Sequence, residues 1–141
     1  MEREAEKCQP LCTFCLRLKL HAERMKEREE RMSPYSKNPK TVNRRKNTER
    51  NRKHVNTKKL EAGECMVCKR KVTPENLPGF DWMHESWGTK GTYAGGQAGI
   101  SKLVCLGASL ERIDEELAKC KGLGCANCHK LETDTERAAE L

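Results

Sequence analysis

Two short stretches decide the fold of this chain: Phe80-Asp81-Trp82-Met83-His84 and, further along, Cys125-Ala126-Asn127-Cys128-His129. The second stretch contains a Cys-x-x-Cys pair, and a matching pair, Cys65-Met66-Val67-Cys68, precedes the first. Two such pairs supply four soft thiolates, which is the ligand set of a closed tetrahedral zinc site. Four unrelated thiols would require two coincidental pairs. We therefore expect one structural Zn²⁺ to join both ends of a small domain through Cys65, Cys68, Cys125 and Cys128.

The order of these motifs resembles that of the HNH (ββα-metal) nuclease family, in its four-cysteine zinc-knuckle branch. The resemblance covers about residues 64 to 135 and is most specific at residues 80–84 and 125–131. It implies a small α+β, zinc-stabilised ββα-metal fold. It also implies a metal-dependent DNA endonuclease, in which His84 takes a proton from the attacking water and His129 binds the catalytic divalent ion.

One position departs from the family pattern. The residue immediately before the base histidine is commonly an Asp that binds the metal, and here it is Met83, a thioether with little affinity for Mg²⁺ or Mn²⁺. Asp81 lies two residues earlier and replaces this Asp only if the strand bends. The expected activity is therefore impaired, and Ni²⁺ or Co²⁺ should tolerate the missing carboxylate better. The alternative is a non-catalytic zinc protein that serves assembly, in a nucleoprotein particle or a virion.

The N-terminus carries a partial copy of the second motif. An acidic stretch, a Lys-Cys pair and Cys12-x-x-Cys15 repeat the order found around residues 115–131, and Leu16 takes the place of the histidine. This copy lacks the residue that would bind a catalytic metal. Two interpretations stay open: a vestigial knuckle with free thiols, or a second zinc held by Cys8, Cys12, Cys15 and His21.

The formal net charge of +7 is concentrated in one segment. Residues 17–60 contain 16 Lys and Arg against five Glu, a net charge of +11, whereas the rest of the chain carries −4. This segregation indicates a partner with a phosphate backbone, most directly DNA, and a merely solvated helix is the alternative. The cations expected to contact phosphates are Arg44, Arg45, Lys46, Arg50, Arg52 and Lys53.

The composition limits the domain plan and the compartment. Only 35% of the 141 residues are hydrophobic and 4% are aromatic, so the core is small and needs an additional cross-link for stability. We expect a Cys-rich half-finger and helix over residues 1–32, a basic linker or helical arm over 33–61, and the HNH-like domain over 62–141. Cysteines in tight pairs, with neither a signal peptide nor a membrane-length apolar run, indicate a protein of a reducing compartment (cytoplasm or nucleus) or of a virion, not a secreted one. This plan is compatible with protein partners or a homo-oligomer.

Local signals predict the remaining elements. Residues 80–84 should form a strand, residues 120–124 the return strand, and residues 88–99 a glycine-rich surface loop without regular structure. Ser109 should cap an amphipathic helix with acidic residues in its first turn. Further helices are expected over residues 16–32, 40–60 and 126–138, the second ended at Gly63. Cys105, in an apolar run, is expected to be buried.

Overall fold

The structure is a computed structural model, and it describes residues 12–31, 38–85, 91–93 and 96–139. Within these ranges, no helix combines the length and the apolar character that crossing a membrane requires. The elements in chain order are α2 (Thr13–Arg31), α3 (Pro39–Ala62), η1 (Leu77–Gly79), β1 (Phe80–His84), β2 (Thr92–Tyr93), β3 (Gly96–Gln97), α4 (Ile100–Cys105), α5 (Leu110–Ala118), β4 (Cys120–Cys125) and α6 (Ala126–Ala139).

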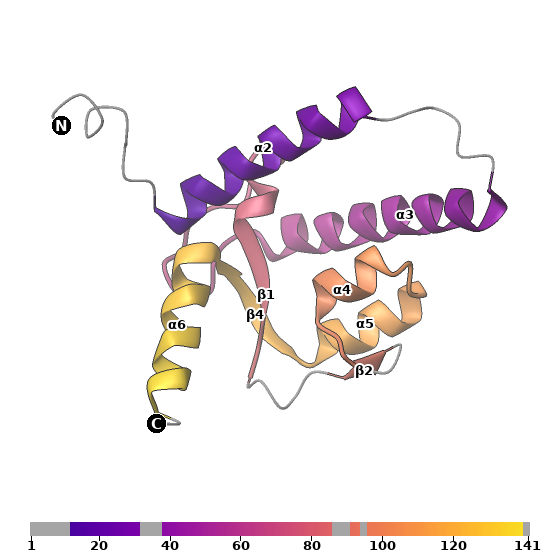
Figure 1. Ribbon diagram of the computed structural model, residues 1–141. Coiled ribbons are helices and arrows are strands. Elements are labelled where there is room, and N and C mark those ends of the chain that lie inside the picture. The colour runs from indigo at the N-terminus through magenta and orange to yellow at the C-terminus, as the bar shows by residue number, and fades with distance from the viewer. Residues whose placement is uncertain (1–11, 32–37, 86–90, 94–95, 140–141) are drawn as a thin grey trace, which may run out of the picture.

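A two-stranded antiparallel sheet, β1 paired with β4, lies at the centre of the fold, and the chain is a small α+β protein. Phe80 stands opposite Cys125 at one end, and the register shifts between Met83 and His84 at the other. The helix α6 follows β4 without a break and packs on one side of the hairpin, with α4 and α5 on the other (Figure 1). The predicted strand, return strand and last helix are confirmed.

Two hydrophobic clusters share β1 as their common wall. Trp82 packs against both. The first cluster joins α3, α4 and α5, and the second joins α2, the hairpin and the start of α6. Their buried members are Val55, Ala98, Ile100, Leu103, Val104, Ala108 and Ile113 in the first, and Phe14, Cys65, Phe80, Leu123, Cys125 and Ala126 in the second.

The helix α2 belongs to the second cluster. The ring of Phe14 meets the ring of Phe80 edge to face, with centroids 5.5 Å apart. It lies so close to Gly79 that a Cβ at this position would clash with the ring. The side chain of Asn127 accepts a hydrogen bond of 3.0 Å from the backbone N–H of Phe14 and so caps the first turn of α2. The expected boundary at residue 32 therefore does not separate two cores.

The basic helix α3 also packs on the rest of the fold. Asn51 is fully buried and donates a hydrogen bond of 2.9 Å to the backbone carbonyl of Ala108, while Val55 joins the first cluster. The helix ends at Gly63, as predicted, because the glycine adopts a φ of 79° and returns its N–H to Lys59. Contacts thus cross the boundary expected at residue 61, since one face of α3 is needed to cover the small core.

Three local features differ from, or refine, the sequence predictions. The strands β2 and β3 form a short hairpin inside the segment expected to lack regular structure, and Trp87 lies outside the described residues. Cys105 is exposed, so the expectation of a buried side chain is wrong. Leu103 and Val104 fill the core face of α4, and Cys105 ends that helix. Ser109 caps α5 as predicted, accepting a hydrogen bond from the N–H of Arg112.

Candidate metal centre and active site

The four predicted cysteines come together. Their Sγ atoms all lie within 4.8 Å of one another. Cys65 and Cys68 stand on a tight turn after α3, in which the N–H of Cys65 donates to the carbonyl of Arg70 and Lys69 takes a positive φ of 63°. Cys125 ends β4 and Cys128 lies in the first turn of α6. The cluster could therefore hold a metal ion such as zinc.

The electrostatics of the cluster favour a bound cation. Burial opposes ionisation of Cys65, but backbone N–H groups, including that of Cys125 at 3.3 Å, lower its pKa to about 6. Burial and hydrogen bonds among the neighbouring thiols raise the pKa of Cys128 to about 12, and the pKa of Cys125 is raised as well. The Cys65 thiolate thus forms readily, whereas Cys125 and Cys128 resist ionisation. Because a divalent cation offsets their mutual repulsion, the donor set fits a thiophilic metal.

A second group of side chains joins β1 to α6. His129 Nδ1 lies 3.0 Å from Asp81 Oδ2, and the guanidinium of Arg17, from α2, contacts the same carboxylate oxygen. Burial of Asp81 would raise the pKa of its carboxyl group, but the hydrogen bonds and charges of His129 and Arg17 lower it to about 2. Asp81 therefore carries a stable negative charge beside the predicted metal-binding histidine. Sequence reasoning did not include Arg17, because no local pattern links it to the strand.

Met83 does not take part in this group. Its side chain is 1% exposed and lies against Gly124, where a Cβ would clash with the methionine sulfur. Met83 is thus a packing residue, and the carboxylate that contacts His129 is that of Asp81.

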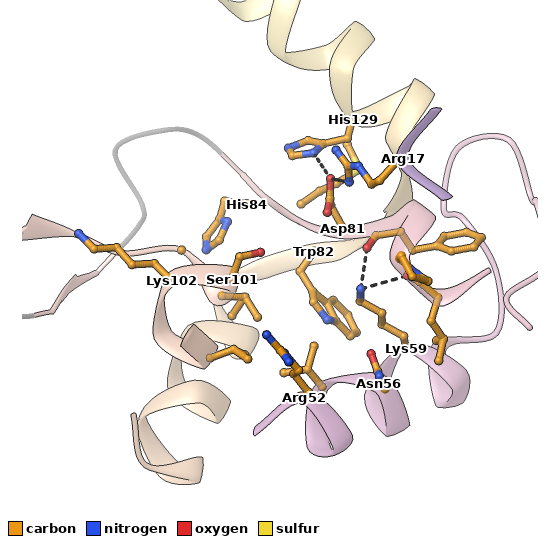
Figure 2. A pocket seen from close by; sticks show the side chains of 18 of the residues that line it. Arg17, Arg52, Asn56, Lys59, Asp81, Trp82, His84, Ser101, Lys102 and His129 are labelled. Carbon is orange, nitrogen blue, oxygen red and sulfur yellow. Dashed lines mark hydrogen bonds and ion pairs between the residues drawn. The ribbon is translucent and has the colours of Figure 1, made fainter. Parts of the chain in front are cut away.

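His84 stands apart from the pair formed by Asp81 and His129 (Figure 2). Its side chain is 7% exposed, and its Nε2 atom lies 2.9 Å from Oε1 of Glu116, which is fully buried in α5. Burial opposes ionisation of Glu116, but hydrogen bonds from Gly91, His84, Arg112 and Lys119 lower the pKa of its carboxyl group. Glu116 was missed because an acidic residue on an amphipathic helix is ordinarily solvated. The sequence signal that could have identified Glu116 is its position on the apolar side of α5.

One groove connects these groups. It has a volume of about 910 Å³ and runs between β1 and the helices α2, α3, α4 and α6. The side chains of Arg17, Asp81 and His129 point toward one another at one end, and Trp82 lies in the middle (Figure 2). The His, Lys, Arg, Asp and Glu residues that line it are Arg17, His21, Arg52, Lys59, Asp81, His84, Lys102, His129, Glu132 and Glu136.

The predicted N-terminal zinc ligands are only partly assembled among the described residues. The N–H of Cys15 contacts the Sγ of Cys12 at 3.4 Å, and this bond is the main cause that lowers the pKa of Cys12 to about 7. His21 lies six residues after Cys15 on α2, about 9 Å along the helix axis, and it lines the groove. Cys8 lies outside the described residues. The second zinc site stays a prediction.

The six predicted phosphate-binding cations divide into three groups. Arg44 and Arg50 donate hydrogen bonds to the backbone carbonyls of Cys105 and Ala108, so they hold α3 against α4 and α5. Lys53 pairs with Glu49 on the helix surface. The third group consists of the exposed residues Arg45, Lys46 and Arg52. Of these three, Arg52 lines the groove.

Comparison of this chain with protein-family models, with curated proteins and with solved structures finds no match.

Proposed function

We propose that this protein is an HNH-type, zinc-stapled protein that binds DNA and hydrolyses its phosphodiester bonds slowly with a divalent metal ion. One observation carries the proposal: the contact of Asp81 with His129, and the side chain of His84, open on a single groove above a β-strand–β-strand–helix unit. This combination provides an acid–base group and a metal-binding pair within reach of one extended ligand.

The four cysteines supply the structural part of the proposal. Cys65 and Cys68 belong to the turn after α3, and Cys125 and Cys128 belong to the junction of β4 and α6. A Zn²⁺ ion held by all four would fasten the two ends of the hairpin unit to each other. Because the clusters of hydrophobic residues are small, this bond would supply much of the stability of the fold.

The catalytic part rests on three side chains. Asp81 and His129 would hold a divalent ion, which when bound stabilises negative charge on the phosphate. His84 would accept the proton of the attacking water. One carboxylate and one imidazole suit Ni²⁺ or Co²⁺ better than Mg²⁺, which prefers oxygen ligands. Since Arg17 pairs with Asp81 and competes with an ion, we expect a low rate.

DNA binding is assigned to α3 and the groove. The exposed residues Arg45, Lys46 and Arg52 present charge along the helix surface, and Arg52 continues it into the groove. Contacts of this kind neutralise phosphates without reading the bases. The protein should therefore bind DNA with little preference for sequence.

A second candidate function is a non-catalytic role in the assembly of a nucleoprotein particle or a virion. The observation that favours it is the ion pair between Arg17 and Asp81, together with the buried Met83. In that case the arginine replaces the metal ion as the partner of Asp81, and the same groove and cations serve binding only.

An assay of supercoiled-plasmid nicking distinguishes the nuclease function from the non-catalytic assembly function. We expect slow nicking with Ni²⁺ or Co²⁺, less with Mn²⁺ and least with Mg²⁺, and its loss in both His84→Ala and His129→Ala. His54→Ala is the matched control, because His54 pairs with Asp114 on the surface between α3 and α5. Undiminished DNA binding without nicking under any of these metals would establish the second function. Nicking that survives both substitutions would contradict the catalytic assignment.

A further inference from the structure

We infer that Glu116 is the positioning residue that holds the His84 imidazole with its proton on Nε2, so that Nδ1 is the basic nitrogen. The inference rests on the proposed function, because a positioned base matters only to a reaction. It adds a residue of α5 to a site otherwise assembled from β1 and α6.

The two oxygens of Glu116 have different partners. Oε1 accepts from His84 Nε2 at 2.9 Å and from the backbone N–H of Gly91 at 3.1 Å. Oε2 accepts from Arg112 at 3.2 Å and from Lys119 at 3.4 Å, and the Gly91 N–H also reaches it at 3.2 Å. The two cations thus balance the buried charge at Oε2, while Oε1 contacts the imidazole and the Gly91 N–H.

This arrangement dictates the tautomer of a neutral His84. A carboxylate at 2.9 Å only accepts hydrogen bonds, so the proton of the neutral imidazole stays on Nε2. The Sγ atom of Cys120 also lies 3.7 Å from the same nitrogen. A carboxylate behind a histidine fixes the ring in this way at many catalytic and metal sites.

The carboxylate itself has little freedom to move. Glu116 is 0% exposed and lies in α5. A Cβ added at Gly91 would overlap the ends of the Arg112 and Glu116 side chains, which would have to shift. A group held from four directions transmits a defined orientation to the ring that it contacts.

The tautomer of His84 is measured on the zinc-loaded full chain by ¹⁵N NMR of the imidazole nitrogens. His84→Ala identifies the signal among the four histidines of the chain. We expect the wild-type ring to carry its proton on Nε2. Glu116→Gln should convert it to a mixture of tautomers, whereas Glu115→Gln, the exposed neighbour on α5, should leave it unchanged. A wild-type ring protonated on Nδ1, or a Glu116→Gln ring that keeps a pure Nε2–H form, would overturn the inference.

A kinetic measurement accompanies the spectrum. Glu116→Gln should reduce Ni²⁺-dependent nicking about 10–100-fold, as expected when the partner of a functional histidine is removed, while the Kd for DNA stays the same. If the wild-type protein shows the Nε2–H tautomer but no nicking, the positioning contact stands and the proposed nuclease fails. If Glu116→Gln does not fold, the wild-type tautomer still tests whether Glu116 holds the proton of His84 on Nε2, because its measurement needs no substitution.

Discussion

Met83 packs its sulfur against Gly124 across the hairpin, on the face of β1 that also carries Asp81. The glycine is necessary there, because a Cβ would occupy the space of the thioether. A side chain in this position is shielded from water and lies two residues from an ionised carboxylate. Met83 is therefore an integral part of the packing of the hairpin.

Met83→Asp should lower the free energy of unfolding by about 1–3 kcal/mol, because it places a second carboxylate in a buried position. Met83→Leu preserves the apolar volume and should cost less than about 1.5 kcal/mol. Urea unfolding of both variants measures the difference. Ni²⁺ should restore stability to Met83→Asp alone, if the new carboxylate joins Asp81 and His129. Equal stability of the two variants without metal would show that the site tolerates charge.

Cys125→Ser should remove the zinc and unfold the chain. Loss of one thiolate disrupts a site that contributes on the order of 10 kcal/mol to folding, which is comparable with the whole stability of a small domain. Elemental analysis and far-ultraviolet circular dichroism report both effects. Cys105→Ser is the matched control, since that thiol is exposed and lies outside the cluster. Unchanged metal content in Cys125→Ser would refute the zinc site.

Replacement of Arg45, Lys46 and Arg52 by Gln should weaken DNA binding and flatten its salt dependence. At about 0.9 per phosphate contact, the slope of log K against log salt should fall by roughly 2 to 3. The matched control removes three exposed cations of α2: Lys19, Arg24 and Arg28. Fluorescence anisotropy with duplex DNA gives the slopes. An equal loss in both triple variants would mean that total charge, and not the position of α3, determines binding.

Arg17→Gln should strengthen binding of Ni²⁺ at Asp81 and His129, because it removes the cation that competes for the carboxylate. Calorimetric titration of the zinc-loaded protein measures the affinity. Lys19→Gln, two residues along α2, is the control for loss of one charge, and Asp81→Asn should abolish the binding. If Arg17→Gln binds no Ni²⁺, Asp81 and His129 do not form a metal site.

Lys59 should make the stability rise with pH in the alkaline range. Its ammonium group donates to the backbone carbonyls of Phe80 and Leu77, and burial lowers its pKa below the usual 10.5. Between the lowered pKa and 10.5 the unfolded chain binds more protons than the folded one, so deprotonation favours folding. The unfolding free energy of the wild type should therefore rise relative to that of Lys59→Met as the pH approaches 10.5. A difference independent of pH would contradict the lowered pKa.

The sequence by itself determined the elements whose signals are local. Each Cys-x-x-Cys turn brings its own two thiols together whatever surrounds it, whereas the two pairs meet only in the folded chain. Ser109 caps α5 and Gly63 ends α3 because the capping groups belong to the same turn as the groups they satisfy. The strand from Phe80 to His84 followed from its motif in the same way.

Only the tertiary structure decided the partners of the titratable residues. Glu116 meets His84, and Asp81 meets both His129 and Arg17, over separations of 32 to 64 residues. No local rule relates such positions, because each side chain is oriented by the element that carries it and the elements meet through packing. The same reason explains α3: its sequence shows no apolar stripe, yet Asn51 and Val55 are buried because this helix packs against α4 and α5.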